Sequence, residues 1–258
     1  MRTAVVQLEA TTDVDVNLEA IGHHLEDAAG AGAQLVVLPE ASMHDFGAPD
    51  LPLGPVAQPL DGPFVVSVGE LARKADVTVV VGMFERSDDP ARPYNTLAVL
   101  GRDGDVVHRY RKAHLYDSFG YRESDRLSAG PFEPVVVPMG EFTLGLMTCY
   151  DLRFPEVARA LVDEGADVLV APSAWVRGPL KEDHWTTLLR ARAIENTVYV
   201  VGAGQTGKTY VGRSAVVDPM GVPVASMGAE QGYAVADLRS SYIAEVRRSN
   251  PSLANRRL

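Results

Sequence analysis

The chain has 258 residues, of which 46% are hydrophobic and 22% charged, a composition typical of a globular protein. Its formal net charge of −10 argues against binding to nucleic acid or to an anionic membrane surface, because both kinds of binding use basic patches. The single cysteine excludes an intrachain disulfide and a multi-cysteine metal site.

The sequence also bears on location. No apolar run approaches the roughly 18 residues that a membrane helix needs. The first residues lead directly into a strand-like segment, which is too short to be the apolar core of a secretory signal. A lone reduced thiol suits the cytosol. We therefore expect a cytoplasmic protein with neither a membrane nor a nucleic-acid partner.

Strand-like and helix-like segments alternate in the first half of the chain. The strands are short apolar runs, and the helices carry apolar residues three or four apart. The predicted order is strand 3–8, helix 15–29, strand 34–38, helix 65–74, strand 77–84, and strands 94–100 and 106–110 joined by a turn at 101–104.

The second half continues in the same way. Its predicted order is strand 142–148, helix 155–164, strand 168–171, helix 182–195, strands 197–203, 210–218, 222–226 and 233–237, helix 239–247 and a tail at 250–258. Helices that alternate with strands indicate an α/β fold whose sheets are covered on their outer faces. No linker-like or low-complexity segment interrupts the pattern, so we expect residues 1–258 to form one domain.

A weak internal echo relates the two halves. Residues 32–42, GAQLVVLPEAS, resemble residues 165–175, GADVLVAPSAW. In both segments a helix ends at Gly-Ala and a short buried strand ends at proline. Two similar β–α halves packed about a pseudo-twofold axis would give this pattern.

Cys149 is the most informative residue. It ends the apolar run 142–148 and precedes the polar stretch YDLRFPE at 150–156. Open α/β sheets react at the carboxyl ends of their strands, so a thiol at this place is a candidate nucleophile. The alternative is a buried cysteine that acts only as a small hydrophobic residue.

Two further residues are candidates for the same chemistry. Glu40 follows a predicted strand and Pro39, where a carboxylate can be a general base whose pKa is raised by partial burial. Lys112 can lower the pKa of a thiol and stabilise an oxyanion. The alternatives are a loop glutamate in solvent and a basic, solvated strand end. The histidines show no metal-ligand spacing, so we expect no metal.

One motif points to a different class of protein. Residues 202–209, GAGQTGKT, satisfy the phosphate-loop pattern G-x-x-x-x-G-K-[ST] and follow a predicted strand. A true phosphate loop opens into a helix that holds the phosphates at its N-terminus. Here the residues after Lys208 alternate between apolar and polar before a Pro-Met-Gly turn, which predicts a strand. A hairpin connection is favoured over an NTPase.

Taken together, three segments resemble the signatures of the nitrilase, or carbon–nitrogen hydrolase, superfamily. They are LPE ending at Glu40, YRKAHL around Lys112, and CYDLRFPE starting at Cys149, in the order of that family. The stretch from Arg122 to Gly130 resembles the family's E-(x)n-G segment and places its second glutamate at Glu123. Four further segments, at 172–175, 184–185, 190–195 and 214–221, extend the resemblance over nearly the whole chain.

The resemblance implies a four-layer α-β-β-α sandwich with two β-sheets. It also implies a Glu–Lys–Cys triad in which Glu40 takes the proton of Cys149 and later activates water. Lys112 and the backbone N–H of Tyr150 would hold the oxyanion, and Glu123 would orient Lys112 or the substrate. No cofactor is implied. The family further implies a homodimer or larger assembly, with the tail at 250–258 crossing to the partner.

The branch of the family is indicated by the residues after the nucleophile. CYDLRFPE is similar to the amidase branch that contains omega-amidase and deaminated-glutathione amidase, which favours a small, carboxylate-bearing linear amide as substrate. Trp175 and the loop 176–183 depart from that branch. We expect Tyr150, Trp175 and Arg177 to bind substrate, with Arg177 or Lys181 meeting the carboxylate.

Two other functions stay open at this point. A nitrilase or an N-carbamoyl amidohydrolase would use the same triad on another substrate. A non-catalytic binding module is the remaining alternative, although nothing obliges such a protein to keep Glu40, Lys112 and Cys149. The proline-rich stretch 45–60 shows no pattern that predicts its path.

Overall fold

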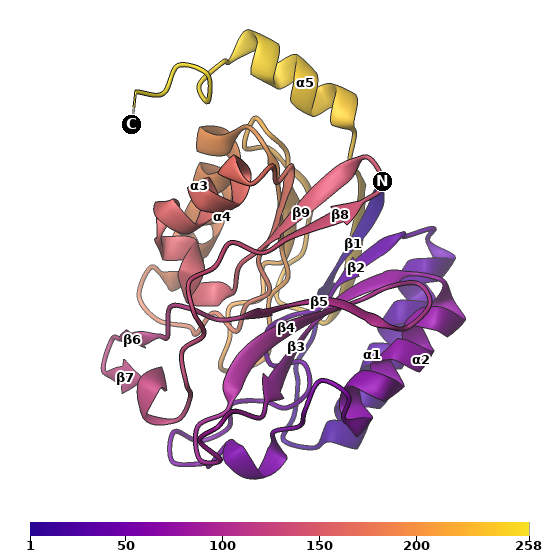
Figure 1. Ribbon diagram of the computed structural model, residues 1–258, viewed down its shortest axis with the longest axis vertical. Coiled ribbons are helices and arrows are strands. Elements are labelled where there is room, and N and C mark those ends of the chain that lie inside the picture. Colours follow the sequence, from indigo (N-terminus) through magenta and orange to yellow (C-terminus); the bar gives the residue numbers. More distant parts are fainter. Residues whose placement is uncertain (258) are drawn as a thin grey trace.

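Two six-stranded sheets pack face to face, with helices on their outer faces, in the computed structural model, which describes residues 1–257 (Figure 1). The first sheet has the order β14-β1-β2-β3-β4-β5 and the second β13-β12-β11-β10-β9-β8. The predicted four-layer α-β-β-α sandwich is therefore confirmed.

The bounds of the elements are as follows. The strands of the first sheet are β1 (Arg2–Gln7), β2 (Leu35–Val37), β3 (Thr78–Glu85), β4 (Tyr94–Leu100), β5 (Val106–Arg111) and β14 (Gly232–Asp237). Those of the second sheet are β8 (Val136–Met139), β9 (Phe142–Leu146), β10 (Val168–Val170), β11 (Tyr199–Gly202), β12 (Ala215–Val217) and β13 (Pro223–Ser226). The helices are α1 (Val14–Gly30), α2 (Pro63–Ala75), α3 (Pro155–Asp163), α4 (Lys181–Asn196) and α5 (Ser240–Ser249).

The two sheets repeat one topology. Strands β1, β2 and β3 are parallel, and β3 continues into the antiparallel strands β4 and β5. In the second sheet β9, β10 and β11 are parallel, and β11 continues into the antiparallel strands β12 and β13. The echo in the sequence falls on β2 and β10, the middle strands of the two parallel sets. The two halves are thus related as the predicted pseudo-twofold requires.

Side-chain alternation along the strands builds the three layers of the core. Val5 of β1 packs between the sheets, whereas Ala4 and Val6 pack under helices α1 and α2. In β10, Val168 and Val170 face the first sheet, and Leu169 lies under α3 and α4. Successive strand residues point to opposite faces, so a strand covered on both sides is apolar throughout.

Local signals fix where the helices begin. Helix α1 begins after Asp13, whose carboxylate accepts hydrogen bonds from the backbone N–H groups of Asp15 and Val16. Helices α2 and α3 each have proline in the first turn, where its missing N–H costs nothing. Helix α3 follows directly on the turn that contains Cys149, so its start sets the end of that turn.

One predicted strand was too long, and several short elements were missed. The strand predicted at 210–218 is limited to β12, because Gly212 and Arg213 adopt left-handed backbone conformations with φ of 68° and 56°. Strand β8, the small hairpin of β6 (Asp117–Ser118) and β7 (Tyr121–Arg122), and three short 3-10 helices have no counterpart in the predicted order. The 3-10 helices are η1 (Gly54–Val56), η2 (Glu123–Asp125) and η3 (Cys149–Arg153).

The segment with the phosphate-loop pattern is not followed by a helix. Beyond β11 it pairs with neighbouring segments through isolated bridges at Gly204 and Gln205, and the next regular element is the strand β12. Lys208 is exposed on the surface. The structural requirement for a phosphate loop is therefore not met.

The C-terminal tail lies on its own subunit as far as it is described. Leu253 packs against the cluster beneath α3 and α4, and Arg256 forms an ion pair with Asp163 of α3. The last residue of the predicted tail, 258, lies outside the described residues. Among the helices of residues 1–257, none is long and apolar enough to cross a membrane. The cytoplasmic location stays a prediction.

Candidate active site

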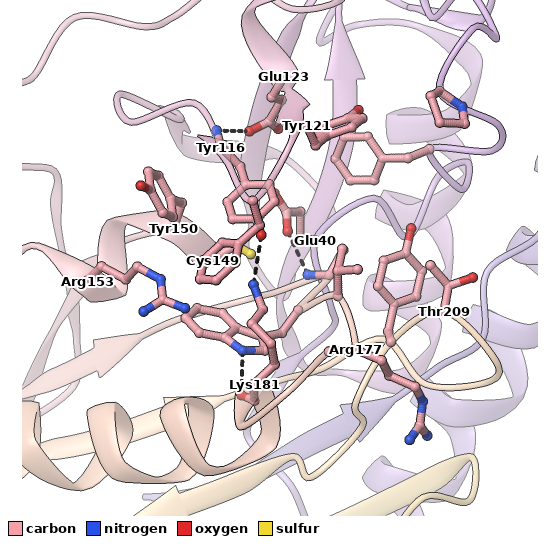
Figure 2. Close-up of a pocket in the computed structure, with 18 of the residues that line it drawn as sticks. Glu40, Tyr116, Tyr121, Glu123, Cys149, Tyr150, Arg153, Arg177, Lys181 and Thr209 are labelled. Atoms are coloured by element: carbon pink, nitrogen blue, oxygen red, sulfur yellow. Dashed lines mark hydrogen bonds between the residues drawn. The ribbon is translucent and has the colours of Figure 1, made fainter.

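Cys149 lies at the carboxyl end of β9, at the first residue of the 3-10 helix η3. Its backbone N–H donates to the carbonyl oxygen of Pro172 at 3.0 Å, which extends the pairing of β9 with β10 by one residue. Its φ is 46°, a left-handed conformation that is uncommon for residues other than glycine. The sharp turn directs the side chain away from the strand and into a cavity (Figure 2).

Glu40 reaches the same cavity from the other sheet. It follows β2 and Pro39, and the first residue beyond it, Ala41, has a φ of 56°. One carboxylate oxygen, Oε2, accepts the backbone N–H of Ala174 at 2.6 Å, and the other, Oε1, accepts Lys112 Nζ at 2.9 Å. Only 1% of Glu40 is exposed, so it is not a loop glutamate in solvent.

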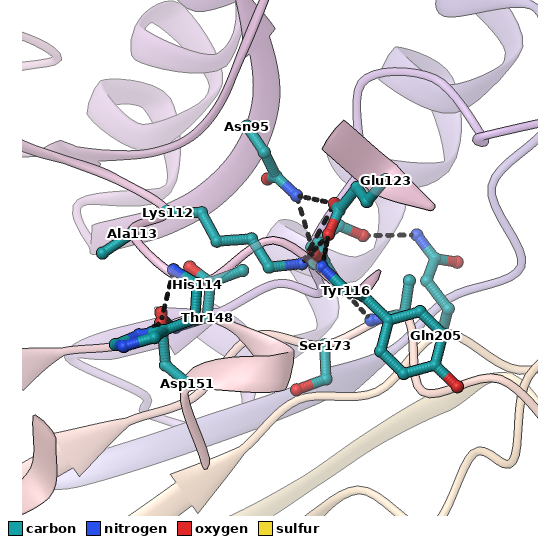
Figure 3. A network of polar contacts seen from close by, with 12 residues as sticks. Asn95, Lys112, Ala113, His114, Tyr116, Glu123, Thr148, Asp151, Ser173 and Gln205 are labelled. Carbon is teal, nitrogen blue, oxygen red and sulfur yellow. Dashed lines mark hydrogen bonds and ion pairs between the residues drawn. The ribbon is translucent and has the colours of Figure 1, made fainter. Parts of the chain in front are cut away.

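Lys112 follows the end of β5 and is held by two carboxylates. Its Nζ donates to Glu40 and to both oxygens of Glu123, at 3.0 and 2.9 Å for the latter (Figure 3). Glu123 in turn accepts the backbone N–H of Tyr116 at 2.5 Å. Lys112 is 2% exposed, which rules out a solvated strand end. The ammonium is fixed between two fully buried acids.

Asn95 of β4 also connects these acids. Its Nδ2 donates to Glu40 Oε1 at 2.7 Å and to Glu123 Oε1 at 3.4 Å. The sequence gave no sign of this residue, because a lone asparagine inside a strand carries no motif. Its position opposite the loop of Glu40 follows only from the pairing of β3 with β4.

The cavity around these residues has a volume of about 680 Å³. Glu40, Lys112, Glu123 and Cys149 lie on its lining, together with aromatic walls from Phe46, Tyr116, Phe119, Tyr121, Tyr150, Trp175 and Tyr210. Its size and its mostly apolar lining with a few convergent polar groups are typical of a small-molecule site. Both sheets contribute to it, so the cavity lies across the junction of the two halves.

Two cations line the cavity without a carboxylate partner among residues 1–257. Lys181 Nζ donates to the Tyr116 hydroxyl at 2.8 Å and lies 4.6 Å from the centroid of the Phe119 ring. Arg153 lies 4.8 Å from the centroid of the Trp175 ring, and its buried Nε has no hydrogen-bond partner. Desolvation, followed by the positive charge of Arg153, lowers the pKa of Lys181.

Comparison with known proteins assigns the chain to a family. Residues 2–248 match the family model described as carbon-nitrogen hydrolase. The chain belongs to the carbon–nitrogen hydrolase family. It is 39% identical over 258 residues to the deaminated glutathione amidase of Escherichia coli O157:H7, with 100% of this chain and 97% of that protein covered.

Solved structures agree with this family. Saccharomyces cerevisiae Nit3, described as a member of branch 10 of the nitrilase superfamily, superposes with a TM-score of 0.88 at 28% identity over 100% of this chain and 97% of its own. An amidase from Nesterenkonia sp. AN1, whose active-site cysteine carries acrylamide after a Michael addition, superposes with a TM-score of 0.82 at 28% identity over 96% and 99% of the two chains. The predicted enzyme acting on non-peptide C–N bonds is confirmed.

The substrate-binding residues predicted for this hydrolase have different positions. Trp175 is buried, and its Nε1 donates to the carbonyl oxygen of Lys181 at 2.8 Å, so it forms the wall behind the cation. Tyr150 also lines the cavity. Arg177 is exposed at the rim, with its Nε 3.3 Å from the carbonyl oxygen of Gly207. Arg153 was missed, although it is part of the CYDLRFPE segment.

The effect predicted for Lys112 on the thiol of this hydrolase needs a correction. The pKa of Cys149 is raised well above its ordinary value by burial and by the charge of Glu40, and Lys112 only partly offsets this. Burial lowers the pKa of Lys112, but Glu123 and Glu40 override it and raise that pKa well above its usual range. Lys112 is thus always charged, while its charge is already shared by two acids.

Proposed function

We propose that the protein is a cysteine amidase that hydrolyses a small linear amide with a carboxylate on its acyl part, through a thioester intermediate. The observation that carries this proposal is the convergence of Cys149, Glu40 and Lys112 in one cavity whose far wall holds two unpaired cations. Membership of the family and the amidase named above support it.

The proposed reaction begins with the neutral thiol. Because the pKa of Cys149 is raised, Glu40 removes its proton as the sulfur attacks the amide carbon. Lys112 and the backbone N–H of Tyr150 stabilise the oxyanion of the tetrahedral intermediate. The C–N bond breaks as Glu40 returns the proton to the leaving nitrogen, which leaves an acyl thioester on Cys149.

Water completes the cycle. Glu40 takes a proton from the water that attacks the thioester carbon, the C–S bond breaks, and the carboxylic acid and the free thiol are released. In this scheme Glu123 is a positioning residue that holds Lys112. A positioned base contributes about 10²–10⁴-fold to the rate and an oxyanion donor about 10²–10³-fold.

The two cations give the acyl part its orientation. Arg153 and Lys181 are placed to receive a carboxylate, because an anion there would relieve their mutual repulsion and occupy the unpartnered Nε of Arg153. Arg177 at the rim lies farther from this pair in its contacts and is assigned to the outer, leaving-group end of the substrate. The natural amide is therefore a monoamide of a dicarboxylic acid or a derivative with a substituted nitrogen.

The first test is a comparison of the wild type with Cys149→Ala on a panel of small amides. The panel includes α-ketoglutaramate and deaminated glutathione, and release of ammonia or of the amine product is measured. We expect turnover that Cys149→Ala abolishes while its circular dichroism and melting temperature stay unchanged. Turnover retained in the pure variant would overturn the triad. Activity confined to nitriles or N-carbamoyl compounds would select those branches, and silence throughout would leave a binding module.

The carboxylate site is tested with matched substrates and a matched arginine. Glutaramate and valeramide have the same chain length, but only glutaramate carries a carboxylate. Arg153→Met or Lys181→Met is expected to raise KM for glutaramate about 10–100-fold, the effect of losing a charged hydrogen bond, with little change for valeramide. Arg177→Met is the control and should leave glutaramate unaffected. A rise in KM for glutaramate only in Arg177→Met would return the carboxylate to the rim.

We also propose that the protein assembles as a homodimer or larger oligomer. The family resemblance supports this assembly, and the described tail residues, which pack on their own subunit through Leu253 and Arg256, leave the other face of the tail for a partner. Light scattering at micromolar concentration should give at least twice the monomer mass. A monomer would contradict the proposal.

A further inference from the structure

A buried carboxylate lies two residues beyond Cys149. Asp151 is 0% exposed and accepts four hydrogen bonds (Figure 3). Its Oδ2 accepts the backbone N–H of Thr148 at 2.9 Å and the hydroxyl of Tyr110 at 2.8 Å. Its Oδ1 accepts the backbone N–H of His114 at 3.2 Å and the imidazole Nδ1–H at 2.8 Å.

The four donors come from two segments that meet nowhere in the sequence. Thr148 belongs to the turn that contains Cys149, in the second sheet. Tyr110 and His114 flank Lys112 at the end of β5, in the first sheet. The hydroxyl of Tyr110 also accepts the backbone N–H of Ala113 at 3.2 Å. One carboxylate thus joins the backbone on both sides of the lysine to the turn of the thiol.

The turn at Cys149 needs such support. A residue other than glycine held at positive φ costs on the order of 1–3 kcal/mol and persists only where its surroundings fix it. The φ of 46° at Cys149 is fixed on one side by the bond to Pro172 and on the other by Asp151, which binds the N–H of the preceding residue. The imidazole of His114 also stacks on Phe154 at the end of the turn, with ring centroids 4.0 Å apart.

We infer that Asp151 is a positioning residue that sets the distance and orientation of Lys112 relative to Cys149. The inference rests on the proposed function, in which Lys112 stabilises the oxyanion formed at the carbon that Cys149 attacks. Asp151 does not touch the substrate, since it has no surface on the cavity. It acts by clamping the two segments that carry the reacting thiol and the stabilising ammonium.

The division of labour between the two oxygens predicts what a conservative change does. Asp151→Asn keeps one acceptor oxygen, so it can serve either His114 or the pair of Thr148 and Tyr110, but not both. Its amide N–H₂ then faces N–H or O–H donors on the other side. The clamp opens on that side, and a displacement of about 1 Å at a reacting group costs about 10²-fold in rate.

The experiment compares Asp151→Asn and the milder Tyr110→Phe with Asp218→Asn. Asp218 is a matched control because it is buried and accepts two backbone N–H groups, of Met220 and Val222, in a turn of the second sheet outside the cavity. We measure kcat and KM on the best amide, the melting temperature, and the rate of alkylation by iodoacetamide, which reports Cys149 alone because the chain has one cysteine.

The expected result is a fall in kcat of about 10²-fold for Asp151→Asn and about tenfold for Tyr110→Phe, with KM changed less than about threefold. Alkylation should slow in both variants, because the ammonium no longer lies beside the forming thiolate. Asp218→Asn should lower only the melting temperature. If Tyr110→Phe and folded Asp151→Asn lose thermal stability but keep kcat and the alkylation rate, Asp151 is only structural and the inference fails.

The two proposals can fail separately. If the wild type hydrolyses no amide but Asp151→Asn still slows alkylation relative to Asp218→Asn, the clamp stands and the proposed function falls. If amide turnover depends on Cys149 but neither Asp151→Asn nor Tyr110→Phe changes kcat, the proposed function stands and the clamp falls.

Discussion

Two carboxyl groups share one ammonium beside the thiol, and this balance decides the resting state of the site. Glu40 and Glu123 both bind Lys112, and all three side chains are at most 2% exposed. A lysine that stood alone would stabilise a thiolate. Here the acids outnumber it, so the thiol stays protonated until a base removes its proton during attack. Burial and the charge of Glu40 also explain why the pKa of Glu123 is raised, although Lys112 opposes them.

The role of Glu40 leads to a prediction with two opposite signs. Glu40→Gln removes a negative charge that raises the pKa of Cys149, so the thiol pKa should fall. Alkylation by iodoacetamide at pH 7 should therefore accelerate, while amide turnover falls by about 10²–10⁴-fold because the general base is lost. The measurement is the alkylation rate against pH for wild type and variant.

A buried glutamate on the same sheet provides the control for this prediction. Glu85 is 4% exposed and pairs with Arg111, and Glu85→Gln should leave the alkylation profile of the wild type unchanged. The wild-type rate should still be rising above pH 8.5, the ordinary pKa of a free cysteine. Slower alkylation in Glu40→Gln would mean that Glu40 favours the thiolate, contrary to the charge balance described here.

At the scale of elements, the site depends on how closely β3 lies against the loop after β2. Gly82 of β3 lies against Pro39, Glu40 and Ala41, and a Cβ at this position would stand 2.6 Å from the backbone nitrogen of Ala41. The neighbouring atoms belong to the backbone, so they cannot turn aside. The absence of a side chain at Gly82 is what lets the carboxylate of Glu40 reach the cavity.

Gly82→Ala is therefore predicted to displace Glu40. Overpacking of this kind costs about 1–3 kcal/mol of stability. Amide turnover should fall at least tenfold, as expected for a base moved by a few tenths of an ångström or more. Gly30→Ala, at the end of α1 with nothing within 4 Å of its Cβ, is the control and should leave activity unchanged. Full activity of Gly82→Ala would show that the loop can shift without moving the carboxylate.

Elements with a strong periodic pattern were predictable, and those shaped by tertiary contacts were not. The parallel strands are apolar on both faces and the helices amphipathic, so their order could be obtained from the sequence. The turn at Cys149 and the left-handed residues Gly212 and Arg213 depend on contacts between sheets, which leave no local pattern. Glu40, Lys112 and Cys149 were found through motifs. Asn95 and Asp151 act through partners far away in the sequence, and only the fold reveals them.

At the scale of the whole molecule, the cavity exists only while the two halves are docked. Glu40, Lys112 and Glu123 come from the first half, and Cys149, Arg153 and Lys181 from the second. The apolar layer between the sheets joins the halves through residues such as Val5, Val37, Leu146, Val170 and Val201, all fully buried. A layer of this kind makes separate unfolding of one half costly, because it would expose the inner face of the other.

This argument predicts that the chain unfolds as one unit, as expected for one domain. Both tryptophans, Trp175 and Trp185, lie in the second half, so their fluorescence reports that half alone, whereas circular dichroism reports both. In urea, the fluorescence, circular dichroism and loss of amide turnover should share one midpoint at a fixed protein concentration. A fluorescence transition separated from the circular dichroism transition would show two domains. Turnover lost before either would mean that the halves part at the cavity while each stays folded.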